Sequence, residues 1–312
     1  MKSNKPLGLG KINRDILNSV VFPHIQLYKR PVLDANIIKG DTVISHNLAI
    51  GVPLPTLGFF AFHYAASNIA MRFARPNFIV TGIYLPPGST ENELEIIAIR
   101  LGEEAKKYGV KVVAGHTGVY KGLSAPLVSV TCLGRVIRKP NNPSLKDLIL
   151  IAGDIGKEAI WLKTLEKGCT QAGNVEPSWK LTPLPVGIAL THIKNVKLMH
   201  DVSEGGVAGA LYEVAESVPF KLRVDSHHIS FYDGAKDLDE DPLKIPSYGA
   251  LILIASEKGL DKILNTAKKL GYPCSVVGSL ERGRGVFVDG IQIEGIKRTR
   301  LDEIYGSFKH IS

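Results

Sequence analysis

The residues best suited to chemistry lie in the stretch His200-Asp-Val-Ser-Glu-Gly-Gly206, which precedes a helical pattern of small residues. An acid, Asp201, comes before the pair Gly205-Gly206, so a carboxylate and backbone N–H groups are expected to meet at the start of a helix. That arrangement suits a phosphate or a magnesium-bound phosphate. The alternative is an ordinary helix start, with Asp201 or Ser203 as the capping residue. Residue chemistry alone favours this alternative.

Other chemically active residues give weaker signals. Gly8-Leu-Gly-Lys11 lacks the spacing of a P-loop, and glycines near a terminus usually indicate flexibility. The pair His227-His228 has no third metal ligand nearby in sequence, which predicts surface or loop residues. His200 is expected to be a packed or hydrogen-bonded histidine.

Composition indicates a globular protein of a reducing compartment. Cys132, Cys169 and Cys274 have no metal-ligand spacing, which predicts buried structural thiols and a cytoplasmic location. No segment resembles a signal peptide or is apolar over a bilayer-spanning length, so no membrane association is expected. The net charge of +8 favours an anionic partner such as a nucleotide, whereas the scattered basic residues make nucleic acid an unlikely one.

The elements that must position these residues fall into two groups. A length of 312 residues predicts two domains, and the turn formers of residues 138–144 place the boundary so that the domains are 1–139 and 140–312. Periodicity predicts helices and strands on both sides of it. The expected helices are 57–72, 91–108, 206–216, 260–270 and one from 157, and the expected strands are 42–45, 78–84, 111–114, 127–135, 148–152, 250–255, 275–278 and 286–288.

Four stretches in the same order resemble the aminoimidazole ribonucleotide synthase (PurM-like) superfamily. They are residues 58–76, 103–117, 199–216 and 247–255, and they are most similar to archaeal proteins resembling the hydrogenase-maturation carbamoyl dehydratase. The resemblance implies an N-terminal α+β domain that forms a sheet or barrel with a second subunit, and hence a homodimer. It also implies a C-terminal α/β domain. Active relatives bind ATP with Mg²⁺ held by aspartates and phosphorylate or activate a small substrate.

The resemblance also implies which residues form the site. Asp34 and Asp201 retain family acids, but the two other acids fall on Asn47 and Asn68, so these four residues would surround Mg²⁺ with two charges missing. Because Mg²⁺ selects charged oxygen ligands, its affinity should be reduced. The residues expected around the nucleotide are Asp34, Asn68, Gly115, His116, Thr117, Asp201, Gly205 and Gly206.

Two functions therefore remain open. The first is a protein that binds ATP or another nucleotide and activates or phosphorylates a small substrate. Residues 301–312 contain no cysteine, so we do not expect carbamoyl dehydration on a terminal cysteine. The second is a non-catalytic dimeric scaffold that binds a metabolite or a protein.

Overall fold

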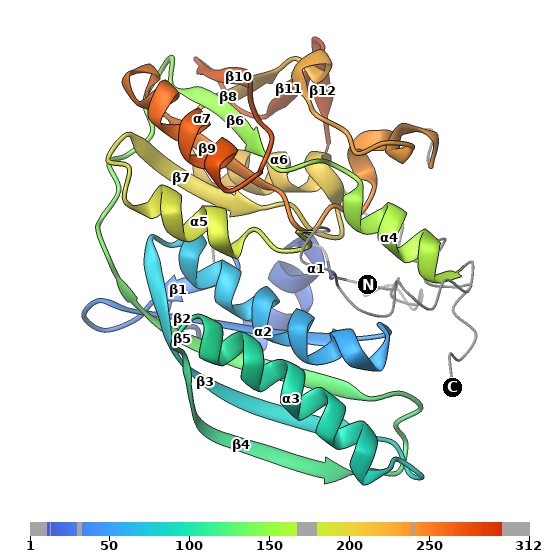
Figure 1. Ribbon diagram of the computed structural model, residues 1–312. Coiled ribbons are helices and arrows are strands. Elements are labelled where there is room, and N and C mark those ends of the chain that lie inside the picture. The colour runs from blue at the N-terminus through green and yellow to red at the C-terminus, as the bar shows by residue number, and fades with distance from the viewer. Residues whose placement is uncertain (1–10, 13, 30–32, 167–179, 239–240, 295–312) are drawn as a thin grey trace.

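A computed structural model of the chain describes residues 11–12, 14–29, 33–166, 180–238 and 241–294. Two sheets, each covered by helices, lie one above the other, with helix α2 (Leu54–Met71) between them (Figure 1). The expected fold class, two units that each combine helices with a sheet, is confirmed, but the upper sheet is mostly antiparallel and not the parallel sheet typical of an α/β unit.

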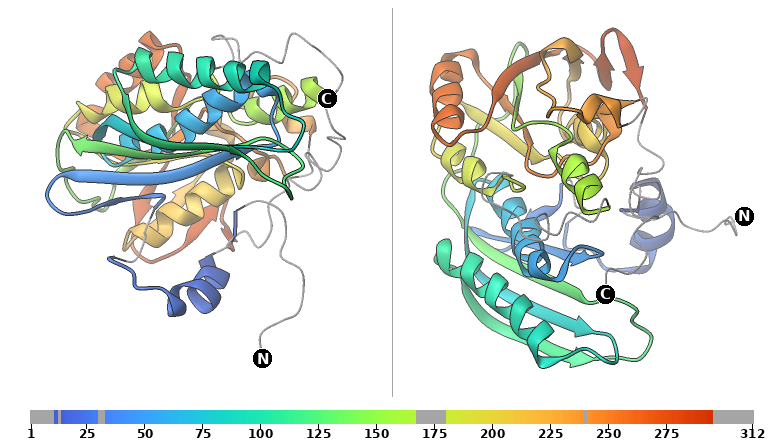
Figure 2. Two further views of the ribbon diagram at one scale, coloured as in Figure 1. Left: turned by 90° about the horizontal axis from the view of Figure 1, so that it is seen from below. Right: turned by 45° about the vertical axis from the view of Figure 1, so that its right-hand side comes forward.

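The lower sheet has five strands, and α2 and α3 (Glu91–Lys107) pack on one face of it (Figure 2, left). The opposite face carries exposed apolar side chains: Leu48, Ile50 and Phe78 are each 46% exposed. In spatial order the strands are β1 (Ala35–Ile37), β2 (Thr42–Ile50), β5 (Leu127–Val136), β3 (Ala74–Leu85) and β4 (Lys111–Val119).

The two helices of this unit form for different reasons. Helix α3 begins with a capping box, in which Thr90 and Glu93 bond to each other's backbone N–H groups, and its apolar stripe is buried. Helix α2 is apolar on all sides because it packs against α3 and β2 on one side and against α5 (Leu184–Thr191) and β7 (Val196–Asp201) of the upper unit on the other. Both expected helices are confirmed, and α2 begins three residues earlier than expected.

The upper sheet has seven strands. Helices α5 (Leu184–Thr191) and α7 (Leu260–Lys269) lie on the side facing α2, whereas α6 (Gly206–Ser217) packs in a second core on the other side (Figure 1). Helix α4 (Lys157–Glu166) follows the first strand. In spatial order the strands are β12 (Ile291–Ile293), β11 (Val286–Val288), β8 (Lys221–Val224), β10 (Cys274–Glu281), β6 (Leu148–Ala152), β9 (Leu251–Ala255) and β7 (Val196–Asp201).

A short helical segment precedes both sheets in the chain. The segment consists of α1 (Arg14–Ile16) and the turns that follow it to His24.

The exposure of two histidines and two cysteines can be compared with the sequence expectations. His227 and His228 are exposed, as expected. Cys132 is buried and Cys274 half-buried, and burial raises the pKa of both thiols to about 12, whereas Cys169 lies outside the described residues. In the part of the chain that the structure describes, none of the helices is both long and apolar enough to cross a bilayer.

Candidate functional site

A cleft of about 1050 Å³ opens where the amino-terminal segment, strands β1 and β2, and helix α6 meet. It therefore joins the two units. The residues that line it include Lys11, Asp34, His46, Ser203, Gly206 and Glu213.

Five charged or titratable residues meet here, and we call them the acid cluster: Lys11, Asp34 and Glu213, which line the cleft, and His200 and Asp201, which lie buried beside them. Strand β7 ends on His200 and Asp201, both buried, and Asp34 directly precedes β1. One ligand atom from each of Asp34, His200 and Asp201 lies within 4.8 Å of the other two. The structure thus brings together the two retained acids of the sequence prediction.

Lys11 joins the acids of the two units. Its Nζ lies 2.8 and 2.9 Å from the two carboxylate oxygens of Asp34 and 3.0 Å from Glu213 Oε1. Its backbone N–H also donates to Glu204 Oε2 at 2.8 Å. Burial disfavours the ammonium, but the charges of Asp34 and Glu213 outweigh it and raise the pKa of Lys11 above its usual range.

His200 is tied to helix α6. Its Nε2 lies 2.6 Å from Glu213 Oε2, and its Nδ1 lies 3.6 Å from Asp201 Oδ1. Burial acts against the charged imidazole, yet the hydrogen bond and charge of Glu213 raise the pKa of His200 overall. The expectation of a packed, hydrogen-bonded histidine is confirmed.

Asp201 is the least satisfied member of the cluster. Its side chain is only 8% exposed, and Oδ1 has no hydrogen-bond partner among the described residues. Burial raises its pKa, although His200 opposes that shift. A buried carboxylate oxygen without a donor is costly, and a cation is the natural partner for it. The cluster therefore fits a divalent cation held by Asp34 and Asp201, with His200 adding a nitrogen to the oxygen donors.

The start of helix α6 differs from the ordinary capped helix. Gly205 is the N-cap and no side chain caps the helix, so neither Asp201 nor Ser203 has the capping role considered above; Asp201 instead ends β7. Gly206 has a φ of +60°, and a Cβ there would lie 2.4 Å from the carbonyl oxygen of Leu243. Only glycine suits this turn. The uncapped first-turn N–H groups leave a helix terminus suited to an anion.

The two asparagines at family acid positions belong to the lower unit and are not among the residues that line the cleft. Asn47, on β2, donates from Nδ2 to the carbonyl of Tyr64 at 3.4 Å, and Asn68 is buried near the end of α2. The residue before it, Ser67, contacts the hydroxyl of Tyr248 from the upper unit at 2.9 Å. In the described structure, neither asparagine hydrogen-bonds to a member of the acid cluster.

Gly115, His116 and Thr117 lie elsewhere. They belong to β4, which is the edge strand at the opposite side of the sheet from β1. His116 is exposed and bonds the hydroxyl of Tyr120. Within one copy of the chain, these residues are thus separated from Asp34 by the width of the sheet.

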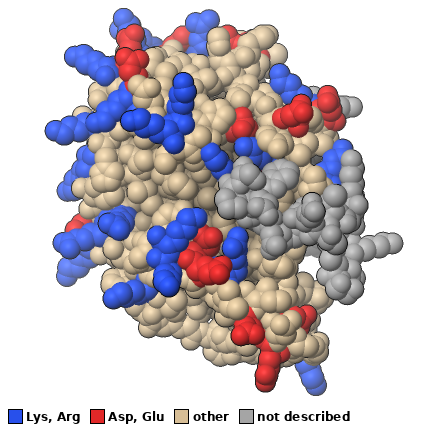
Figure 3. Space-filling view, in the orientation of Figure 1, with Lys and Arg blue, Asp and Glu red and all other residues tan. Residues whose placement is uncertain are grey.

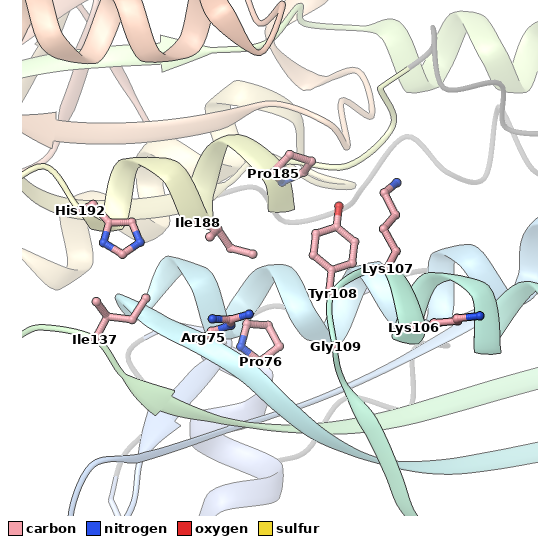
Figure 4. A pocket seen from close by; sticks show the side chains of 10 residues that line it. All are labelled: Arg75, Pro76, Lys106, Lys107, Tyr108, Gly109, Ile137, Pro185, Ile188 and His192. Atoms are coloured by element: carbon pink, nitrogen blue, oxygen red, sulfur yellow. The ribbon is translucent and has the colours of Figure 1, made fainter.

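A second groove, of about 680 Å³, lies between the two units beside α3 and α5 (Figure 4). Its cationic lining side chains, Arg75, Lys106 and Lys107, are exposed, and more Lys and Arg than Asp and Glu side chains appear on this face of the molecule (Figure 3). The groove lacks a buried polar group of the kind that Asp201 supplies, so the acid cluster is the better candidate site.

Sequence reasoning missed two members of the acid cluster. Lys11 was considered only with Gly8 and Gly10, which lie outside the described residues. Glu213 is seven residues after Gly206 and therefore two turns along the same face of α6, a spacing that could have indicated it. Another acid, Glu158, is buried nearby, and burial together with the charges of Glu204 and Asp201 raises its pKa to about 7, although the N–H of Tyr248 opposes the shift.

Sequence comparison identifies the family. Residues 32–136 match the N-terminal domain of AIR synthase related protein, and residues 155–291 match the C-terminal domain of the same family. The chain belongs to the AIR synthase related family. Its PurM-like two-domain fold, expected from the four ordered stretches, is confirmed.

Two relatives are similar to this chain over most of their own length. The carbamoyl dehydratase HypE of Rhizobium leguminosarum bv. viciae is 24% identical over 250 residues, which cover 76% of this chain and 71% of HypE. The thiamine-monophosphate kinase of Pyrococcus horikoshii is 25% identical over 235 residues, covering 71% of this chain and 70% of the kinase.

Solved structures agree on the fold. A HypE chain from a HypE–HypF complex aligns with a TM-score of 0.77 at 20% identity, over 91% of this chain and 98% of that chain. HypE in complex with ATP aligns with a TM-score of 0.72 at 21% identity, over 94% and 97% of the two chains. At 20% and 21% identity, these alignments show that this chain shares the fold of HypE.

Proposed function

We propose that this AIR synthase related protein binds ATP or another nucleotide, together with a divalent cation, in the cleft of the acid cluster, and that it activates or phosphorylates a small substrate. The observation that carries the proposal is the meeting of Asp34 and Asp201, from the two units, beside the uncapped start of α6. HypE in complex with ATP and the thiamine-monophosphate kinases support it as relatives of the same fold.

Different parts of the cleft would bind the phosphate oxygens and the cation. First-turn N–H groups of α6 would hold phosphate oxygens beside Gly205 and Gly206. Asp34 and Asp201 would hold the cation, whose chemistry is to neutralise phosphate charge. Asn47 and Asn68 stand at family acid positions but carry no charge, so Mg²⁺ should bind more weakly than it would to four carboxylates.

Thermal unfolding with ATP, in the presence and absence of Mg²⁺, tests the proposal. A ligand that binds only the native state stabilises it, so millimolar ATP should raise the melting temperature by several degrees. Asp201→Asn should reduce the part of the shift that depends on metal. Asp261→Asn, at an exposed acid in the first turn of α7, is the matched control and should leave the shift unchanged. No shift with any nucleoside triphosphate would contradict nucleotide binding.

A non-catalytic scaffold is the second candidate, and the neutral residues Asn47 and Asn68 favour it. Such a protein would keep the fold and dimer without turnover. Nucleotide binding without any loss of the γ-phosphate in the presence of candidate small substrates would support the scaffold.

We also propose that the chain forms a homodimer through the uncovered face of the five-stranded sheet and divides into domains 1–139 and 140–312. The exposed Leu48, Ile50 and Phe78 support pairing, because an apolar sheet face of this kind is normally covered. Light scattering at micromolar concentration should give twice 33.9 kDa. Leu48→Lys with Phe78→Lys should produce the monomer, and a wild-type monomer would contradict the proposal.

A further inference from the structure

His200 is held in an orientation that suits a metal ligand. Because Nε2 is engaged by Glu213 at 2.6 Å, Nδ1 is the nitrogen that faces the acids. A carboxylate behind a histidine fixes the ring and its tautomer in many metal sites. The 3.6 Å between Nδ1 and Asp201 Oδ1 is close to the separation of two ligand atoms around one ion with bonds of roughly 2.1 Å.

Asp201 supplies an independent indication. Its Oδ1 is buried and has no donor within the described residues, although it lies at the centre of a group of polar side chains. Water is excluded from this oxygen, so the energetic cost of burying it is not recovered by a hydrogen bond. An ion between Asp201, His200 and Asp34 would recover it, since their ligand atoms already lie within 4.8 Å of one another.

Lys11 is the competitor for this position. Its ammonium contacts both oxygens of Asp34 and one of Glu213, whereas within the described residues it makes no hydrogen bond to Asp201, on which it acts only through its charge. It thus neutralises one side of the cluster and leaves the other unsatisfied. An incoming dication must displace Nζ from Asp34 and any proton from His200 Nδ1.

We propose that Asp34, His200 and Asp201 form a site for a divalent transition metal of the zinc type, in preference to Mg²⁺, and that Lys11 is an internal cation that occupies Asp34 until the metal binds. Imidazole suits Zn²⁺ and Co²⁺, whereas Mg²⁺ prefers an all-oxygen shell. Three protein ligands leave a coordination position for a phosphate or substrate oxygen. The inference deepens the proposed function, because it concerns the cation of the same cleft.

The test uses the full chain, stripped of metal and without nucleotide, so that it does not depend on nucleotide binding. In the His227→Asn background, calorimetric titration with Zn²⁺ should show one site per chain, with Mg²⁺ at least about tenfold weaker. Co²⁺ should give visible absorption bands from a site with a nitrogen ligand. His200→Asn should weaken Zn²⁺ at this site by about tenfold or more, and Lys11→Met should strengthen it about threefold or more by removing the competitor.

A second group of side chains in this protein can bind Zn²⁺, and the test must remove it. His227 belongs with Asp225 and Asp289 to an exposed group whose ligand atoms are as close together as those of the acid cluster. Because that group can itself take up Zn²⁺, all variants are made in the His227→Asn background. Equal Zn²⁺ affinity with and without His200, or Mg²⁺ binding as tight as Zn²⁺, would overturn the inference. If His200→Asn does not fold, an unchanged Zn²⁺ affinity in both Lys11→Met and Asp34→Asn overturns it equally. Failure of ATP to shift the melting temperature, with the Zn²⁺ result intact, would instead refute only the nucleotide proposal.

Discussion

In the described part of the chain, two buried histidines, His63 and His200, each contact a glutamate, and they differ in what the second ring nitrogen does. In the lower pair, His63 Nε2 lies 3.0 Å from Glu104, and Nδ1 lies 2.8 Å from the hydroxyl of Thr182, in the upper unit. Burial lowers the pKa of this histidine despite Glu104. In the acid cluster, the pair of His200 and Glu213 leaves Nδ1 beside Asp201 without a hydrogen bond of normal length.

This difference distinguishes a histidine with a structural role, His63, from one whose second ring nitrogen is positioned to bind a ligand, His200. Both nitrogens of His63 are used, its side chain is fully buried, and it connects the two units. His200 is almost as buried, at 3% exposure, but it faces an acid that lacks a donor. Burial alone would not distinguish the two, whereas accounting for each nitrogen does.

Replacement of the two histidines by phenylalanine should give the largest difference. His63→Phe leaves Glu104, 8% exposed, with only Lys107 at 3.6 Å, and should lower the free energy of unfolding by about 3–5 kcal/mol. His200→Phe should cost less than half as much, because Glu213 is 34% exposed and keeps Lys11. Denaturant titration in metal-free buffer measures both. Equal losses would mean that both pairs are structural.

The buried acid Glu158 should make the protein less stable as the pH rises. It accepts the N–H of Tyr248 at 2.7 Å and has no basic partner within the described residues. Because its pKa is raised to about 7, the native state keeps a proton that the unfolded chain has lost. Stability should therefore fall as pH rises from about 4.5 to 7, by on the order of 3 kcal/mol from this group.

Glu158→Gln should remove that part of the pH dependence while it keeps the bond to Tyr248. The measurement is the free energy of unfolding of both proteins at pH 5 and pH 8. Parallel curves would show that Glu158 is not the titrating group.

Local signals predicted much of the fold. The Thr90 capping box, the continuous apolar run of β6 and the glycine turn before α6 lie within a few residues of the elements they define. Helix α5 was missed because Pro183, Pro185 and Gly187 oppose a helix in sequence, although proline at the first positions of a helix is tolerated.

The site was harder to predict than the fold. Asp34 and Asp201 were paired through resemblance, since spacing alone gives no reason for residues so far apart to meet. Lys11 and Glu213 are 202 residues apart, and their contact depends on how α6 packs on β7 and where the amino-terminal segment lies. Such contacts follow from tertiary packing, which periodicity does not encode.

Restoring the two lost family charges should have a smaller effect. If Asn47 and Asn68 occupy former cation-ligand positions, Asn47→Asp with Asn68→Asp should tighten Mg²⁺-ATP by about 1–2 kcal/mol and lower stability without Mg²⁺. Calorimetric titration with ATP, with and without Mg²⁺, decides. Unchanged metal dependence would show that these positions do not face the cation.

The smallest effect is expected for Lys11, and it tests the comparison most directly. Lys11→Met removes the contacts to Asp34 and Glu213, but its side chain is 42% exposed and theirs are 30% and 34% exposed. Ion pairs this exposed contribute little, so the free energy of unfolding in metal-free buffer should change by less than about 1 kcal/mol. Lys11→Arg, which keeps the charge, is the control and should resemble the wild type. A loss of Lys11 as costly as that of His63 would mean that the ammonium is a structural member of the acid cluster rather than an exchangeable one, and the distinction between the two histidine pairs would then no longer hold.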